Sequence, residues 1–269
     1  MKENEKLTSR IAELDILRAA AVLLMIFDHA MFDIWGLLPG VFSGFPPTVG
    51  AWAEIYKTAR AYWSWDVRII VRVVVVFVFL ALTGICCSFS RSNIKRGAKL
   101  LALAMALSVA TDILGAVIGD RDMVILFGVL HCIAVTLILI GVCKLFIKSK
   151  WFYLAAGILM IGLGLYLEKD QVYMSLYSNE PLRVLLATIT GEASSGSDNF
   201  SLFLYGGQIF VGVFLGELLY SERRSRLGLE YKNNLVTATG RHSLVVYIAH
   251  QAIIPIIFAG ILLLCGFRF

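Results

Sequence analysis

Charged residues are scarce in this sequence, and no long polar segment divides it. Only 16% of the 269 residues are Asp, Glu, Lys or Arg, whereas 59% are hydrophobic. The mean hydropathy of +0.80 excludes an ordinary soluble domain and is typical of a polytopic membrane protein. Because no polar linker separates two halves, we expect a single integral-membrane domain over residues 1–269.

Cysteine and histidine are too few and too widely spaced to indicate a metal site. The five cysteines lie in apolar segments without metal-ligand spacing, so we expect them to be small packing residues. No two of the four histidines have the local spacing of zinc ligands. The charged start lacks a cleavage site of the A-x-A type, so no cleaved signal peptide is expected. We likewise expect no metal cofactor and no nucleic-acid partner.

Long apolar segments recur along the chain and predict an all-α fold, a polytopic transmembrane helix bundle of about seven spans. The predicted spans cover approximately residues 12–35, 68–89, 100–118, 123–146, 151–167, 201–220 and 242–265. A further apolar piece, residues 182–189, is too short to span, and its role is open between interfacial and re-entrant. The chain shows no internal repeat of the kind found in transporters built from inverted halves.

Lys and Arg concentrate in every second connection, which predicts the orientation of the bundle. They gather at the amino terminus and in residues 91–99, 144–150 and 223–232. By the positive-inside rule these segments face the cytoplasm. The amino terminus is then inside, the carboxyl terminus is outside, and the long loop at residues 36–66 is external. The aromatic residues of that loop are typical of a membrane interface.

The first predicted helix carries ionisable side chains within an apolar run: Asp15, Arg18, Asp28, His29 and Asp33. Such groups at membrane depth are costly and usually functional. Arg18 and His29 are eleven residues apart, about three helical turns, so they share one face roughly 16 Å apart. Asp15 and Asp33 extend this stripe by a turn at either end, whereas Asp28 points elsewhere. The alternative is that these groups sit at the helix ends and reach the lipid headgroups.

Five short motifs follow one another along the chain. The first is R-x10-H after Leu-Asp, formed by Arg18 and His29. The others are F-L-x-x-x-G at 79–84, G-V-L-H at 128–131, D-N-F at 198–200 leading to G-x-x-x-G at 212–216, and G-R-x-S-L-x-x-Y-x-x-H-Q at 240–251. In this order they resemble the bacterial branch of the heparan-α-glucosaminide N-acetyltransferase family of transmembrane acyltransferases. Two features depart from that family: Ser201 replaces a proline, and the 36–66 loop lacks a histidine found there in some members.

The resemblance implies transfer of an acetyl group from cytoplasmic acetyl-CoA to an acceptor on the extracytoplasmic side. The acceptor would be an amino sugar or another envelope glycan, and the location would be the bacterial cytoplasmic membrane. The expected partners are therefore an acyl-CoA donor, a small-molecule or glycan acceptor and the lipid bilayer, while a homodimer and the choice of O- or N-acetylation stay open. The competing hypothesis is a proton-coupled small-molecule transporter that uses the intramembrane Asp, His and Arg residues.

His29 is the predicted general base, because the pKa of imidazole lies near the operating pH. Asp28 or Asp33 would orient its ring, and an acetylated His29 intermediate is the alternative chemistry. The predicted donor-binding residues are Arg18, Arg91, Arg96, His131 and Arg241. The predicted acceptor-binding residues are Asp198, Arg72, His250 and Gln251. Structural roles stay open for several of them: hydrogen bonding for His131 and His250, an ion pair with Asp15 for Arg18, and topology alone for the basic turns.

Overall fold

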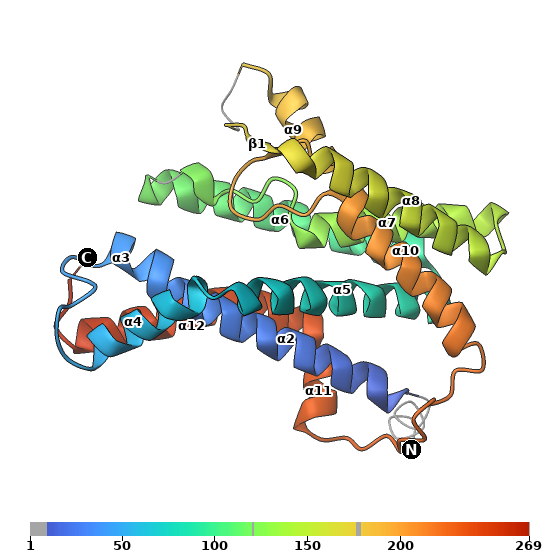
Figure 1. Ribbon diagram of the computed structural model, residues 1–269, viewed down its shortest axis with the longest axis horizontal. Helices are drawn as coiled ribbons and strands as arrows, with labels where there is room; N and C mark the ends of the chain where they lie inside the picture. The colour runs from blue at the N-terminus through green and yellow to red at the C-terminus, as the bar shows by residue number, and fades with distance from the viewer. Residues whose placement is uncertain (1–9, 120, 176–178, 269) are drawn as a thin grey trace. The chain divides into compact units, whose positions relative to one another are not determined.

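The structure, a computed structural model, describes residues 10–119, 121–175 and 179–268. The chain forms two compact units, and each is described by itself. Unit one combines the segment up to Phe79 with the segment from Leu227 onward, and unit two is Leu80–Arg226. Helix α5 (Asp66–Phe89) continues from one unit into the other (Figure 1). The single membrane domain expected from the sequence stays a prediction, and residues 1–9 of the predicted cytoplasmic amino terminus lie outside the described residues.

Seven helices of the described residues are long and apolar enough to cross a membrane. They are built around α2 (Ala12–Phe32), α5, α6 (Asn93–Ile118), α7 (Val129–Phe146), α8 (Lys150–Leu167), α10 (Leu202–Leu219) and α12 (Ser243–Leu264). The predicted all-α polytopic membrane fold is therefore confirmed, whereas the orientation of the termini stays a prediction. Many side chains on these helices are apolar and exposed, as expected where a helix faces lipid.

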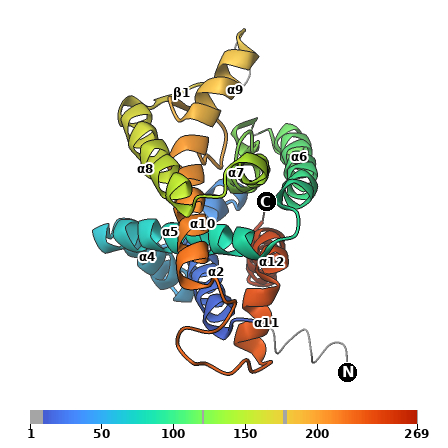
Figure 2. The ribbon, with the colours of Figure 1, turned by 90° about the vertical axis from the view of Figure 1, so that its right-hand side faces the viewer.

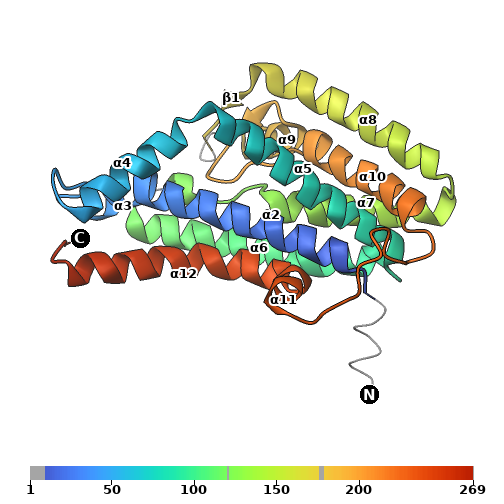
Figure 3. The same ribbon diagram turned by 60° about the horizontal axis from the view of Figure 1, so that its bottom comes forward.

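Unit one is organised around α2. This helix packs against α4 (Ala51–Trp63), α11 (Leu235–Arg241) and α12, and Figure 3 shows α12 running alongside it. An apolar core cluster of the unit lies beyond the end of α2, where the segment 34–45, α4 and α12 pack together. Its buried members are Ile34, Leu38, Phe42, Phe45, Ala59 and Leu262.

Two features of unit one differ from the prediction. The first span does not end at Trp35 but continues through a π-helical turn (Asp33–Leu37) into the short helix α3 (Leu38–Val41). Pro39 lacks an amide donor and its ring would clash with a carbonyl in a regular helix, so a widened turn before it is physically reasonable. The predicted loop at 36–66 contains α4, whose buried face, with Ala53 and Ala59, supplies tertiary packing that hydropathy alone does not reveal.

Unit two is a set of closely packed helices. Helix α6 packs on α7, and α8 packs on α10, which also contacts α7 (Figure 2). Glycines lie where these helices cross. A Cβ atom at Gly157 would come within 2.9 Å of the carbonyl oxygen of Gly207, and one at Gly97 would press on α7. Small residues allow the close backbone approach on which membrane helices depend. An ion pair of 3.0 Å between Lys144 and Glu217 also links α7 to α10.

Two predicted spans of unit two begin at the wrong residue. The third begins at Asn93 rather than at 100, because Ser92 caps the helix by accepting a hydrogen bond from the Lys95 amide at 3.2 Å. The fourth begins at Val129 rather than at 123, because residues 124–127 form bridges to residues 196–199 instead of a helical turn. The apolar piece at 182–189 is part of α9 (Pro181–Thr190), and two short strands, β1 (Val172–Tyr173) and β2 (Ala193–Ser194), pair beside it.

Candidate active site

Two histidines from distant parts of the sequence meet within unit one. His29 lies near the end of α2, and His250 lies on α12. The Nδ1 atom of His29 is 3.3 Å from the Nε2 atom of His250, and the ring centroids are 5.1 Å apart. His250 is buried and His29 is partly buried. The fold therefore joins the R-x10-H motif of the first span to the H-Q motif of the last.

The backbone determines the tautomer of His29. Its Nδ1 atom lies 3.0 Å from the carbonyl oxygen of Met25. A carbonyl oxygen only accepts hydrogen bonds, so we assign the ring proton to Nδ1. Nε2 then carries a lone pair, and no hydrogen bond to it exists within the residues that the structure describes. A nitrogen lone pair of this kind is what a general base or a nucleophile requires.

Asp28 belongs to a different cluster from His29. Both carboxylate oxygens of Asp28 accept hydrogen bonds from Arg68, at 2.7 and 3.0 Å, and Tyr62 donates a third at 3.0 Å. The guanidinium of Arg68 also lies 3.4 Å from the centroid of the Trp63 ring. Burial and the hydrogen bond to Asp28 raise the pKa of the Tyr62 hydroxyl. The prediction that Asp28 orients His29 is therefore not supported, since its oxygens are engaged by α4 and α5.

Asp33 lies one turn beyond His29, at the start of the π-helical turn. Its side chain is buried, and the described residues offer it no hydrogen bond, including none from His29. π-helical turns often occur at functional sites. Asp33 is therefore close to His29 along the chain, and its predicted role in orienting the imidazole stays a prediction.

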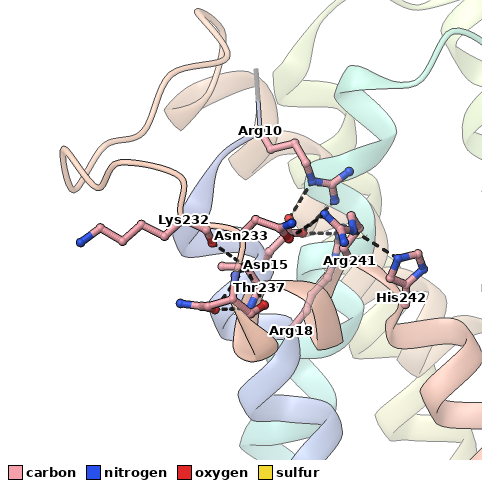
Figure 4. A network of polar contacts seen from close by, with 9 residues as sticks. Arg10, Asp15, Arg18, Lys232, Asn233, Thr237, Arg241 and His242 are labelled. Atoms are coloured by element: carbon pink, nitrogen blue, oxygen red, sulfur yellow. Dashed lines mark hydrogen bonds and ion pairs between the residues drawn. The ribbon is translucent and has the colours of Figure 1, made fainter. Parts of the chain in front are cut away.

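A cluster of basic residues surrounds Asp15 at the other end of α2 (Figure 4). Arg10 donates two hydrogen bonds to the buried carboxylate of Asp15, at 2.8 and 3.1 Å, and Arg18 lies 3.5 Å from the same group. The hydrogen bond to Asp15 raises the pKa of Arg10. Arg241 of α11 donates hydrogen bonds to Asn233 and His242 beside this cluster. Two predicted donor-binding residues, Arg18 and Arg241, thus lie in one polar region.

Gly240 explains why α11 can approach α2 so closely. A Cβ atom at this position would collide with the backbone carbonyl of Asp15. The glycine of the G-R-x-S-L motif therefore allows α11 to contact α2, and this contact brings the neighbouring Arg241 to the start of α2. The Leu-Asp and G-R motifs, which are separated by more than two hundred residues in the sequence, form one structural contact.

His131 has both ring nitrogens engaged inside unit two. The amide of Gly128 donates to Nδ1 at 3.4 Å, and Nε2 lies 3.2 Å from the hydroxyl of Ser108. That hydroxyl donates to the carbonyl of Ile125 at 2.6 Å, so it accepts the proton of Nε2. The buried imidazole thus ties the segment before α7 to α6. Of the two roles left open for His131, the structure supports hydrogen bonding.

Asp198 occupies a comparable position at the start of α7. Its Oδ2 atom accepts a hydrogen bond from the Val129 amide at 3.1 Å. A Cβ atom at Gly128 would collide with the same oxygen, so the glycine of the G-V-L-H motif makes room for this carboxylate. A carboxylate at a helix amino terminus satisfies a free amide and the helix dipole. The D-N-F and G-V-L-H motifs therefore meet, and Asp198 acts on the backbone.

The remaining predicted residues lie on surfaces. Arg72 and Gln251 are exposed on α5 and α12 within unit one. Arg91 and Arg96 are exposed beside the start of α6 in unit two, where Arg96 donates a 3.4 Å hydrogen bond to the carbonyl of Cys86. A search of the described residues for three or more clustered His, Cys, Asp or Glu side chains that could hold a metal ion finds none.

The motif contacts agree with a comparison against known families. Residues 51–252 match the model of the family described as heparan-alpha-glucosaminide N-acetyltransferase, catalytic. The chain belongs to the heparan-α-glucosaminide N-acetyltransferase family. It is therefore an integral membrane protein of a family of acyltransferases, and members of the family generally use acetyl-CoA as donor. No curated protein and no solved structure was found to match the chain.

The family match covers part of the candidate site. It includes His131, Asp198, Arg241 and His250, but it begins at α4, after the helix that carries His29. The contact between His29 and His250 therefore links the first helix to the matched region, as do the contacts of Asp28 with Arg68 and of Asp15 with Gly240.

Sequence reasoning missed two arginines of unit one. Arg68 was not selected because it marks the start of a span, and one sequence does not show which residue Asp28 contacts. Arg10 was not selected because it precedes the first span, although it is only five residues from Asp15 and its long side chain can reach the carboxylate.

Proposed function

We propose that the protein transfers the acetyl group of acetyl-CoA to a glycan acceptor across the membrane, with His29 as general base. The observation that carries this proposal is the imidazole pair of His29 and His250 inside a membrane protein of this family. The assigned tautomer of His29 leaves Nε2 able to take a proton. An imidazole near the outer end of the first span suits an acceptor that arrives from the extracytoplasmic side.

The chemistry requires one proton to move twice. Nε2 of His29 removes the proton from the amine or hydroxyl of the acceptor as its nitrogen or oxygen attacks the acetyl carbon. The carbon–sulfur bond of acetyl-CoA breaks, and the proton on Nε2 passes to the departing thiolate. A positioned acid–base group contributes about 10²–10⁴-fold to the rate of such a step. Acetylation of His29 itself, followed by transfer to the acceptor, uses the same lone pair and is the alternative.

The donor would bind with its phosphates toward the cytoplasmic end of α2. Arg10, Arg18 and Arg241 carry three positive charges there, against the two buried carboxylates of Glu13 and Asp15 in the first turn of α2. Guanidinium groups are well suited to phosphate because they donate two parallel hydrogen bonds. Arg91 and Arg96 are further candidates for the nucleotide on the cytoplasmic side. The distance of roughly 16 Å from Arg18 to His29 along the helix suits the extended pantetheine arm.

The acceptor would approach the opposite end, where Gln251 follows His250 and Arg72 lies one turn after Arg68. The proposed acceptor is an amino sugar or another envelope glycan, in keeping with the α-glucosaminide in the family description. The proposed location is the cytoplasmic membrane of a bacterium.

Release of CoA tests the function directly. The purified protein in lipid nanodiscs is supplied with acetyl-CoA and methyl α-D-glucosaminide, and free thiol is measured together with the acetylated sugar. We expect thiol and acetylated sugar to appear in equal amounts and only when the sugar is present. Uptake of the sugar into proteoliposomes without release of thiol would contradict the proposal and favour a transporter.

A further inference from the structure

His250 is a buried histidine whose position addresses a gap in the proposed mechanism. The predicted orienting carboxylate of Asp28 is engaged by Arg68 and Tyr62, and the residues that the structure describes show no hydrogen bond from His29 to Asp33. The side chain that does face Nδ1 of His29 is the imidazole of His250, at 3.3 Å. Because Nδ1 of His29 carries the proton, the facing Nε2 of His250 is the acceptor.

We propose that His250 is the positioning residue of His29, an inference that rests on the proposed function. The Nδ1 proton of His29 is shared between the Met25 carbonyl at 3.0 Å and Nε2 of His250 at 3.3 Å, and the branch to His250 fixes the ring direction while both branches keep the lone pair on Nε2. When Nε2 takes the proton of the acceptor, the same hydrogen bond stabilises the imidazolium that forms. His250 touches neither the donor nor the acceptor in this role, and it acts through His29.

An imidazole offers an advantage over a carboxylate at this depth. A neutral imidazole accepts a hydrogen bond without adding a buried negative charge to a membrane helix. The titratable groups nearest the pair in the sequence are Asp28 on α2, Asp33 in the π-helical turn and Tyr247 on α12. Asp28 in turn binds Tyr62 of α4 and Arg68 of α5. Asp28 and Arg68 neutralise each other.

Two substitutions at position 250 separate hydrogen bonding from packing. His250→Gln retains an oxygen that can accept from Nδ1 of His29, whereas His250→Leu retains similar bulk without an acceptor. We expect His250→Leu to lower kcat by roughly 10–100-fold while the KM for acetyl-CoA is unchanged. His250→Gln should recover most of that loss, although both variants lose the ring. Equal kcat values for the two variants, or a wild-type kcat for His250→Leu, would overturn the positioning role.

A second readout distinguishes failure of this inference from failure of the proposed function. If the wild-type protein releases no CoA from acetyl-CoA with methyl α-D-glucosaminide, the proposed function is wrong. Diethyl pyrocarbonate, which acylates neutral imidazole nitrogen, then reports on the pair without turnover. Peptide mapping should show faster modification of His29 in the wild type and in His250→Gln than in His250→Leu, because an acceptor at Nδ1 makes Nε2 more basic. Equal rates of modification in all three proteins would overturn the inference.

Discussion

The ionisable residues of α2 have separate partners. Asp15 binds Arg10 and Arg18, Asp28 binds Arg68, and His29 contacts His250. Each partner except Arg18 comes from outside the helix. This separation explains how one apolar helix carries so many ionisable groups, because an unpaired charge in hydrocarbon is far costlier than a paired one.

The pair of Asp28 and Arg68 provides a residue-scale prediction. Arg68→Ala leaves the carboxylate of Asp28, whose side chain is 19% exposed, without its bidentate partner. We expect a loss of about 3 kcal/mol in the free energy of unfolding. This loss corresponds to an apparent melting temperature lower by roughly 6–12 °C in detergent.

Lys57→Ala is the matched control for this prediction. It breaks an ion pair of the same length, 2.7 Å, with Glu54 on the exposed face of α4. Exposed pairs contribute little, so its melting temperature should equal that of the wild type. Similar decreases in melting temperature for both variants would show that the pair of Asp28 and Arg68 contributes no more to stability than an exposed ion pair.

The sequence predicted part of this residue-level picture. Helical periodicity places Arg18 and Asp15 one turn apart, and the structure shows the ion pair between them. Periodicity cannot reveal partners on other helices, so Arg68 and His250 could not be paired with α2 from one sequence. The roles expected for His131 and Asp198 came from their motifs. Whether a motif residue binds a ligand or its own backbone depends on tertiary contacts, such as those with Gly128 and Ser108.

At the scale of elements, glycines determine which helices approach closely. Gly240 lets α11 contact the backbone of α2 at Asp15, where any side chain would collide. Gly240→Ala should therefore destabilise unit one by about 1–3 kcal/mol and displace Arg241 from the Asp15 cluster. We expect a lower melting temperature together with a raised KM for acetyl-CoA.

Gly260→Ala is the control for this substitution. Gly260 also lies in a helix of unit one, but a Cβ atom there meets nothing within 4 Å. Alanine favours the helical conformation over glycine, so stability should be unchanged or slightly higher. A Gly240→Ala protein that behaves like Gly260→Ala would contradict the packing account of α11.

Apolar length identified the seven long helices but not the shorter elements. Hydropathy measures how apolar a segment is, and the apolar runs in α4 and α11 are too short to predict a membrane span. The residues before α7 were predicted to be helical because they are apolar. Their backbone instead bonds to residues 196–199, a pairing between distant segments that hydropathy does not detect.

At the scale of the whole molecule, the alternation of basic connections predicts the orientation in the membrane. Ser43 and Lys95 are exposed residues on opposite predicted sides, in the 36–66 loop and near the start of α6. With the native cysteines replaced, Ser43→Cys should react with an impermeant maleimide added to intact cells. Lys95→Cys should react only after the cells are opened. Labelling of position 95 but not of position 43 in intact cells would contradict the predicted orientation and indicate the opposite one.

Turnover of purified His29→Asn is the most direct test of the central claim, that His29 is the general base of an acetyltransferase. Asparagine keeps polarity and some bulk but cannot take a proton near neutral pH. We expect kcat with acetyl-CoA and methyl α-D-glucosaminide to fall by roughly 10²–10⁴-fold while acetyl-CoA still binds. The control is His131→Asn, because His131 is a buried histidine whose two ring nitrogens are hydrogen-bonded inside unit two. This variant should lose activity only in proportion to the fraction of protein that fails to fold. A near-native kcat for folded His29→Asn would contradict the account.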